Sequence, residues 1–360
     1  MGPCATLRDR IAERHPHARR FHGARLDTAI GSRQLRLVFS RRAQLLFVTG
    51  NRLGDAVLST GALARLIEQI PDARVTVACG ALPASLFADV PGLERLIVMR
   101  RRRNGLHWLA LWAACVTTGW EVVADLRGSM LPWTVIARRR LISRSEYRHE
   151  LRVLEIARQL KFDPPPAPHL FVSPARAARA AAFLGNGPPV LVVAPAATWG
   201  AKQWPSDRFA ETVRRLTGPG GALAGARLAV TAAENERAAA APVLDALPAE
   251  RRIDLVGAPD LLDLHAIVAR CALFIGNDSG LMHLAAAAGT PTLGLFGPSP
   301  DWRYGPWGPN AAVVRTTESF DALVAKNPHF DWRQGESLMA GLSVDAVVEA
   351  AKALLRRTRV

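Results

Sequence analysis

Short apolar runs alternate with longer amphipathic segments along most of this chain. The alternation is typical of strands and helices that follow one another in a parallel sheet with right-handed crossovers. In the first half it predicts strands at residues 45–49, 74–78, 96–99 and 122–126. Helices are predicted at residues 56–70 and 83–88, and in the tryptophan-rich run 104–120.

The alternation pauses where proline and glycine become frequent, in FDPPPAPH after Lys161 and in GNGPP just before residue 190. Such density marks a linker or hinge between domains. Beyond it the pattern predicts strands at residues 190–194, 227–231, 253–256, 272–275 and 292–296. Helices are predicted at residues 174–184, 206–216, 234–247, 260–270, 281–288 and 343–355.

We therefore predict an α/β protein with two doubly wound, Rossmann-like domains that face a cleft. The first domain is placed at residues 43–173 and the second at residues 190–342, with a linker or hinge at 174–189. A basic extension at residues 1–42 precedes them, and a helix at residues 343–360 closes the second domain.

The polar turn GNDSG at residues 276–280 ends one predicted strand and opens an alanine-rich helix. Asp278 or Ser279 is a natural N-cap, and Gly280 permits close approach to the free N–H groups of the helix. Ser279 and His283 are four positions apart and therefore face the same side. The turn predicts an anion site suited to a phosphate. The alternative is an ordinary capped helix, in which His283 lies at the surface or is hydrogen-bonded within the fold.

Two further loops follow strands in the same relative position. In NRLGD, Asp55 is either a general base facing the cleft or the N-cap of the next helix. In PAATWGAKQWP, Lys202 and Thr198 are suited to neutralise a diphosphate, and Trp204 is interpreted as a packing residue. This loop lacks the G-x-x-x-x-G-K-[ST] spacing, which excludes ATP hydrolysis by a P-loop. In TAAENER, Glu236 is either a ribose-binding carboxylate or a glutamate that stabilises a first helical turn.

With 49% hydrophobic and 21% charged residues, the composition is that of a globular protein. The net charge of +15 suits an anionic partner, but no motif of a nucleic-acid reader accompanies the arginines, so nucleic acid is not an expected partner. The four cysteines have no C-x-x-C spacing and are interpreted as reduced thiols of a cytosolic protein without a zinc site. No D-x-D pair or histidine cluster predicts a bound metal, and no apolar segment near the start predicts a signal peptide.

The charge-free run 104–120 is too interrupted for a membrane span. It is interpreted as a mostly apolar helix. Its tryptophans (Trp108, Trp112 and Trp120) follow four consecutive arginines at residues 100–103, which leaves contact with an anionic membrane surface as a second interpretation.

Taken in order, the segments LLFVTGNRLGDAVLSTGAL, APAATWGAKQWPSDRFAETV, TAAENER and FIGNDSGLMHLAAAAGTPTLGLFGPSPDWRYGPWGP resemble glycosyltransferase family 9, the ADP-heptose:lipopolysaccharide heptosyltransferases and their relatives. The resemblance runs from about Leu45 to Leu355. The last segment, with its D-[ST]-G-x-x-H-x-A-A core and following Gly-Pro, is its most specific part.

The resemblance implies a two-domain GT-B fold with the acceptor in the first domain and the nucleotide-sugar donor in the second. It implies that Asp55 is the catalytic base, and that the donor contacts are Thr198, Lys202, Glu236, Asp278, Ser279, Gly280 and His283. The expected reaction is metal-independent, inverting transfer of a sugar, with heptose from ADP-heptose favoured, to a lipopolysaccharide core or related lipid-linked glycan. The nucleotide sugar is a substrate, and no cofactor is expected.

The expected location is the cytoplasm, with possible peripheral contact at the cytoplasmic face of the inner membrane. The alternatives that stay open are another nucleotide sugar and acceptor, or a nucleotide-sugar binding protein without catalysis. The resemblance does not extend to the first 40 residues or settle the acceptor loops, where Thr49 and Gly61 replace an arginine and a proline common in the family.

Overall fold

A computed structural model describes residues 42–101, 103–257, 260–326 and 335–358. Its first sheet is parallel and five-stranded, in the order β3-β2-β1-β4-β5. The strands are β1 (Gln44–Val48), β2 (Arg74–Cys79), β3 (Leu93–Val98), β4 (Trp120–Asp125) and β5 (Ala137–Ile142). The predicted extension falls outside the described residues except for Arg42.

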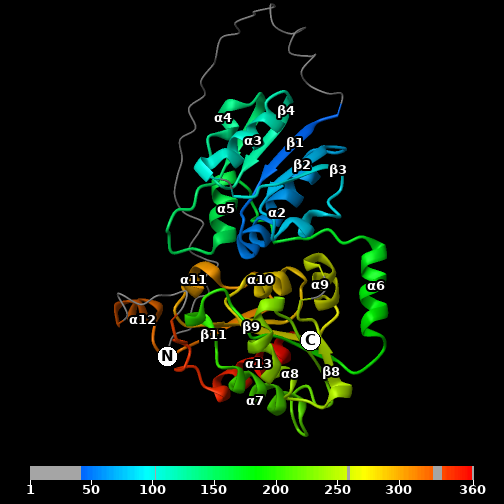
Figure 1. Cartoon of the computed structure of the whole chain (residues 1–360), viewed down its shortest axis with the longest axis vertical. Coiled ribbons are helices and arrows are strands. Elements are labelled where there is room, and N and C mark those ends of the chain that lie inside the picture. The colour runs from blue at the N-terminus through cyan, green and yellow to red at the C-terminus, as the bar shows by residue number, and fades with distance from the viewer. Residues whose placement is uncertain (1–41, 102, 258–259, 327–334, 359–360) are drawn as a thin grey trace, which may run out of the picture. The chain divides into compact units, whose positions relative to one another are not determined.

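Helices cover both faces of this sheet (Figure 1). One face packs against α2 (Leu53–Gln69) and α5 (Arg152–Leu160), with Leu45 and Phe47 of β1 in the shared core. The other face packs against α3 (Leu106–Cys115) and α4 (Leu131–Thr134), with Leu46 and Val48 of β1 in a separate cluster. Alternate residues of a strand point to opposite faces, so both faces of this apolar strand are buried.

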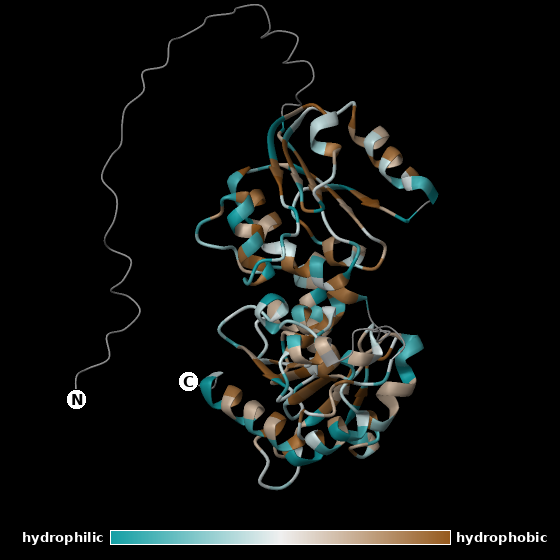
Figure 2. Ribbon diagram, turned by 90° about the vertical axis from the view of Figure 1, so that its left-hand side faces the viewer, coloured by the Kyte–Doolittle hydropathy of each residue, from teal (hydrophilic) through white to brown (hydrophobic). Residues whose placement is uncertain are grey.

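The second sheet is parallel and six-stranded, in the order β11-β10-β9-β6-β7-β8. Its strands are β6 (Val190–Ala194), β7 (Arg227–Val230), β8 (Arg252–Asp254), β9 (Leu273–Asn277), β10 (Thr292–Phe296) and β11 (Ala311–Arg315). One face carries α9 (Leu261–Val268) and α10 (Gly280–Ala287). The other carries α7 (Ser206–Thr217), α8 (Arg237–Leu244) and α13 (Val344–Thr358). The strands of both sheets are coloured mainly as hydrophobic in Figure 2, as expected for sheets covered on both sides.

The prediction of two doubly wound α/β units is confirmed. The bounds of β6 and β10 agree with the predicted ones, and α13 packs through Val347, Val348 and Ala351 as expected for a closing helix. Ser343 caps this helix by accepting a hydrogen bond from the N–H of Ala346, at 3.2 Å. Trp204 is a packing residue, since its ring is buried edge-on against Phe209.

Other elements differ from the prediction. Residues 83–88 form a 3₁₀ turn, η1 (Ala84–Phe87), and the helix predicted at 234–247 is divided into η4 (Glu234–Glu236) and the shorter α8, which contains Pro242. Proline within a helix removes a backbone hydrogen bond, which explains why α8 is short. The prediction missed β5, β11, α4, α5, α11 (Asp301–Tyr304) and α12 (Phe320–Lys326).

The two sheets share one continuous apolar cluster. It contains Val57 and Leu63 of α2, Leu160 of α5, and Met282 and Leu284 of α10. The helix α6 (Pro174–Leu184), which occupies most of the predicted linker, adds Ala180 and Leu184 to the same cluster. That residues 174–189 act as a hinge, and the domain bounds themselves, stay predictions.

Candidate active site

The loop after β1 places Asp55 at the start of α2. This helix begins at Leu53, and its N-cap is Arg52, whose side chain makes no capping bond. Asp55 is therefore the third residue of the first helical turn and half-buried. The interpretation of Asp55 as an N-cap is wrong, because α2 starts three residues before the predicted position. Its carboxylate lies in the first turn of the helix, next to the free N–H groups of the helix N-terminus.

The loop after β9 presents the N-terminus of α10 with two unpaired polar atoms. Ser279 occupies the N-cap position in an extended conformation, with φ −148° and ψ 168°, but its side chain makes no capping bond. Ser279 Oγ and His283 Nδ1 are both buried without a hydrogen-bond partner. Buried polar atoms are nearly always paired in native proteins, so two orphans one helical turn apart are a notable departure. They are free to bind a ligand.

Two glycines let α2 and α10 approach each other at their first turns. A Cβ added to Gly280 would lie 2.5 Å from Cβ of Leu53, and one added to Gly54 would lie 3.1 Å from Cδ2 of His283. The first distance is too short for any side chain, so Gly280 is required for this approach. The contact brings the start of α2, with Asp55, next to His283 of α10.

His283 is buried and stays neutral near physiological pH. Burial lowers its pKa because the imidazolium form is poorly solvated there. The negative charges of Asp278 and, less strongly, Asp55 act against this shift, whereas the positive charge of Lys202 adds to it. The charges of all three residues thus act on the same ring, although the residues lie in three different segments of the chain.

Lys202 pairs with Asp278 between two loops of the second sheet. The Nζ–Oδ2 distance is 2.5 Å, and both side chains are largely buried. Lys202 ends the 3₁₀ turn η3 (Gly200–Lys202), and its Nζ also lies 4.7 Å from the centre of the Trp199 ring. A lysine in this position carries a positive charge that is already desolvated, and an anionic ligand can take over from the carboxylate.

Asn277 joins these two loops, although the sequence did not single it out. Its side chain is fully buried at the end of β9. Oδ1 accepts a hydrogen bond from the N–H of Trp204 at 3.1 Å, and Nδ2 donates one to the carbonyl of Pro195 at 2.7 Å. These two hydrogen bonds hold the loop that carries Lys202 against the start of α10. The sequence signal that could have identified Asn277 is a polar residue at the buried end of an apolar strand.

Thr198 and Glu236 lie on neighbouring loops outside this group. Thr198 is exposed in the loop after β6. Glu236 follows β7, and its Oε2 accepts a hydrogen bond from the N–H of Ala233 at 2.9 Å. Glu236 thus stabilises its own 3₁₀ turn, the role expected of a glutamate in a first turn. Since β6, β7 and β9 are adjacent in the sheet, the loops share one edge, but no described contact connects either residue to His283.

The first sheet offers a cationic group that sequence reasoning also missed. Asp125, fully buried at the end of β4, accepts hydrogen bonds from the backbone N–H groups of Arg127 and Ser129, both at 2.8 Å. The turn aims the Arg127 guanidinium at Oδ1 of Asn51, 3.3 Å away in the loop that leads to Asp55. Arg127 also stacks over the Trp108 ring at 4.6 Å. This cation contacts the loop that leads to the candidate base, and no described contact connects it to the donor loops.

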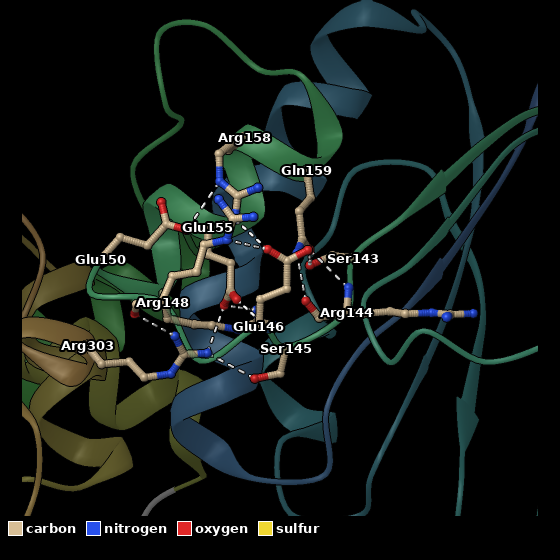
Figure 3. Close-up of polar contacts among 11 residues, drawn as sticks. Ser143, Arg144, Ser145, Glu146, Arg148, Glu150, Glu155, Arg158, Gln159 and Arg303 are labelled. Atoms are coloured by element: carbon tan, nitrogen blue, oxygen red, sulfur yellow. Dashed lines mark hydrogen bonds and ion pairs between the residues drawn. The ribbon is translucent and has the colours of Figure 1, made fainter.

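A second contact between the two sheet units is formed by a buried ion cluster (Figure 3). Arg303 of α11 donates to Oε2 of Glu155 on α5 at 2.9 Å and to Oγ of Ser145 at 2.9 Å. Glu155 is fully buried and also pairs with Arg152. Beside the cluster, Trp302 stacks on His149 with 4.4 Å between ring centres. Nearly every donor and acceptor in this region has a partner.

Metal ligands do not gather anywhere in the described part of the chain: no group of three or more His, Cys, Asp or Glu is placed to hold an ion there. The described cysteines, Cys79, Cys115 and Cys271, are buried and unpaired. Burial raises the pKa of Cys79 and Cys271 to about 12 and that of Cys115 to about 11, which leaves all three as unreactive thiols. Cys4 lies outside the described residues.

Comparison with known proteins gives a family match. The family model for glycosyltransferase family 9 (heptosyltransferase) matches residues 109–329. This range contains every candidate donor residue, whereas Asp55 precedes it. Lipopolysaccharide heptosyltransferase 2 of Salmonella typhimurium is 26% identical over 314 residues, which cover 76% of this chain and 88% of that protein. Lipooligosaccharide heptosyltransferase 2 of Haemophilus influenzae is 31% identical over 162 residues, which cover 42% of this chain and only 45% of that protein.

Solved structures show the same fold. A glycosyl transferase family 9 protein from Veillonella parvula superimposes with a TM-score of 0.71 at 20% identity, covering 88% of this chain and 98% of that chain. The ADP-heptose lipopolysaccharide heptosyltransferase II of E. coli gives a TM-score of 0.66 at 20% identity, covering 88% of this chain and all (100%) of the other. At this identity the likeness concerns the fold, which is GT-B.

Proposed function

We propose, on the premise that the chain belongs to glycosyltransferase family 9, that it transfers heptose from ADP-heptose to a hydroxyl of a lipopolysaccharide core, with inversion at the anomeric carbon. The names of the curated relatives support the sugar and the acceptor. The observation that supports the proposal for this chain is the contact between α2 and α10, which brings the start of α2 against His283, where the charges of Asp55, Asp278 and Lys202 all act on the ring.

Asp55 acts as the general base in this proposal. Its carboxylate accepts the proton of the acceptor hydroxyl while the oxygen forms a bond to the anomeric carbon. The bond from that carbon to the diphosphate breaks on the opposite face, and its electron pair leaves with the nucleoside diphosphate. Attack from the face opposite the nucleotide inverts the anomeric centre.

The second sheet unit binds and activates the donor. The N-terminus of α10 offers free N–H groups to the diphosphate, and Gly280 leaves room for close approach. Ser279 Oγ and His283 Nδ1, which lack partners, supply two further polar contacts. Lys202 exchanges part of its interaction with Asp278 for the phosphate oxygens and stabilises the charge that grows on the leaving group. Thr198 and Glu236 complete the site at its edge; Oε2 of Glu236 is engaged by the N–H of Ala233, and its Oε1 is the oxygen proposed to accept hydrogen bonds from ribose hydroxyls.

The first sheet unit binds the acceptor in this proposal. Arg127 lies against Asn51 in the same loop as Asp55 and is suited to an anionic group of the core oligosaccharide. The acceptor is lipid-linked, so the enzyme works at the cytoplasmic face of the inner membrane. Within the described residues, none of the helices is both long and apolar enough to cross a bilayer. The contact proposed is therefore peripheral.

A transfer assay with the full chain tests the proposal. A heptose-deficient lipopolysaccharide serves as acceptor, and ADP-heptose is compared with UDP- and GDP-sugars. We expect turnover with ADP-heptose alone, undiminished by a metal chelator. In a thermal-shift screen, a donor present at about 100 times its Kd adds about 2.7 kcal/mol to the free energy of unfolding. Turnover with another nucleotide sugar would reassign the donor, and ADP-heptose binding without turnover would indicate a binding protein.

A further inference from the structure

The outer surface of α3 is apolar where a surface helix is normally polar. Only Leu111 and Cys115 of this helix are fully buried against the sheet. Leu106 and Leu109 are 51% and 58% exposed, one turn apart, and Trp112 is exposed beside them. A helix that is apolar all round is normally buried. Exposed apolar patches on soluble proteins mark sites of interaction, so this helix requires a partner.

The segment around α4 extends the same surface. Met130, Trp133 and Ile136 are all exposed, and Trp133 is 60% exposed. The indole N–H of Trp112 donates to the carbonyl of Thr134 at 3.3 Å, which ties α3 to α4. We call Leu106, Leu109, Trp112, Met130, Trp133 and Ile136 the α3–α4 face. Trp120, which the sequence analysis grouped with Trp108 and Trp112, does not belong to the α3–α4 face. Its ring is fully buried, and its N–H donates to the carbonyl of Cys115.

Arginines border the α3–α4 face. Between residues 98 and 140 the sequence contains eight arginines but only two acidic residues, Glu121 and Asp125. One of the arginines, Arg139, turns to the opposite side of the sheet and donates to Gln69 of α2. Asp125 is buried, and Glu121 is paired with Arg138 at 3.0 Å. The register of β5 against β4 turns Arg138 and Arg140 to the side of the sheet that carries α3 and α4. Arg140 also lies over the Trp133 ring at 5.8 Å.

The face is connected to the candidate base through a short series of contacts. Trp108 of α3 carries the Arg127 guanidinium on its ring, and Arg127 reaches Asn51 in the loop before Asp55. A molecule held by an apolar anchor at the α3–α4 face would have these contacts between its anchor and the loop that leads to Asp55. This arrangement suits an acceptor whose lipid lies in a bilayer and whose sugar lies in water.

We propose that the α3–α4 face docks on an anionic phospholipid bilayer, with Leu106, Leu109 and the tryptophans in the interface and the bordering arginines on the headgroups. Tryptophan and leucine beside arginine form the typical composition of interfacial helices. A second copy of this chain is disfavoured as the occupant, because its own arginines would meet these arginines. The inference rests on the proposed function only for the identity of the acceptor.

Vesicle binding tests the proposal with the full chain and without donor or acceptor. Cosedimentation compares vesicles of phosphatidylglycerol and phosphatidylcholine with vesicles of phosphatidylcholine alone. We expect binding to the anionic vesicles only, weakening as salt is raised. Leu109→Glu and Trp133→Glu each place a charge in the interface and should lower the affinity about tenfold or more. The matched control is Phe183→Glu on α6, where the side chain is 54% exposed, and it should bind as the wild type does.

The proposal is overturned if the wild type does not bind anionic vesicles. It is also overturned if Leu109→Glu and Trp133→Glu bind these vesicles as tightly as the control Phe183→Glu. It is also overturned if sedimentation shows that Leu109→Glu abolishes a dimer while vesicle binding is unchanged. All the substituted side chains are exposed, so circular dichroism should show wild-type folding. Transfer to a water-soluble, deacylated acceptor should proceed at the wild-type rate in Leu109→Glu. If the wild type itself does not transfer to this soluble acceptor, the proposed transferase activity is contradicted, whereas the proposed membrane docking is not.

Discussion

Two of the polar places where the described parts of the two sheet units meet are built in opposite ways. Where α11 meets α5, Glu155 accepts hydrogen bonds from Arg303 and from the N–H of Glu146 and also pairs with Arg152, with all of these groups close together. Where α2 meets α10, Ser279 Oγ and His283 Nδ1 have no partner. In the first place the charged groups pair with one another and only Nε of Arg303 lacks a partner, whereas in the second the serine hydroxyl and the histidine Nδ1 are both left free.

The difference distinguishes residues that stabilise the fold from residues that are available for binding and catalysis. A cluster of buried charges in which every carboxylate and guanidinium has a partner of opposite charge holds two elements in place and leaves little capacity for a ligand. Unpaired buried groups cost folding free energy, and a pair of them at a helix N-terminus is available to a ligand. We therefore expect substitutions in the α11–α5 cluster to change mainly stability, and substitutions in the α2–α10 contact to change mainly turnover.

The largest effect on stability is expected for Glu155→Ala. The substitution leaves Arg303, only 1% exposed, and Arg152 buried without their carboxylate. Breaking a buried pair by removing one partner costs about 3–5 kcal/mol in the free energy of unfolding. Urea denaturation measures the loss. Glu349→Ala is the control, because it removes an exposed i,i+3 pair with Lys352 and should leave the midpoint nearly unchanged. Equal midpoints for the two variants would refute the distinction.

Two buried histidines near α10 sharpen the comparison through pH. His265 donates from Nδ1 to the carbonyl of Leu284 at 3.2 Å, and burial lowers its pKa to about 4. The unfolded chain, in which the pKa is about 6.5, binds the proton more tightly, so stability is complete above pH 6.5 and is lost as the pH falls toward 4. His265 alone accounts for a loss on the order of 3 kcal/mol. Burial of His283 contributes in the same direction.

Urea denaturation at several pH values between 7 and about 4 measures this loss. In His265→Leu the free energy of unfolding should fall less steeply over this range, whatever its value at pH 7. An unchanged slope would show that His265 is not the group that titrates.

A smaller effect on stability but a clear one on turnover is expected for Lys202→Met. The variant removes the charge that faces the leaving diphosphate, and loss of one such group lowers kcat on the order of 100-fold. The variant leaves one buried charge, Asp278, without its partner, whereas Glu155→Ala leaves two. The folding cost should therefore be below that of Glu155→Ala. Lys202→Arg keeps the charge and should recover part of the rate. Steady-state kinetics with saturating donor measure kcat, and a variant with unchanged kcat would remove Lys202 from the reaction.

Much of the fold could be predicted because the apolar runs are regular. Strands such as β6 and β10 are continuous apolar segments between loops, and their bounds followed from the pattern. β5 was missed because Arg138, Arg139 and Arg140 occupy its centre, and an edge strand tolerates exposed charges that hide its apolar residues. α5 was missed because its apolar stripe is interrupted by Arg152 and Glu155, which are buried only because they pair.

The candidate site could be predicted only in part. The pattern placed Asp55 and Lys202 in loops that follow strands, and His283 in the helix that follows a third strand, at the edge where parallel sheets bind ligands. It could not predict the Lys202–Asp278 pair, which joins residues 76 positions apart, or the contact of Leu53 with Gly280. Such contacts depend on how the loops are packed, and no local pattern encodes them.

The central claim is that the α2–α10 contact supplies the base for transfer, and Asp55→Asn tests it most directly. Asparagine has nearly the same shape but cannot accept the proton of the acceptor hydroxyl. We predict that ADP-heptose binding, measured by calorimetry, stays within a factor of about two, while kcat falls on the order of 100-fold or more. A variant that retains near wild-type turnover would contradict the account and remove Asp55 from the role of base.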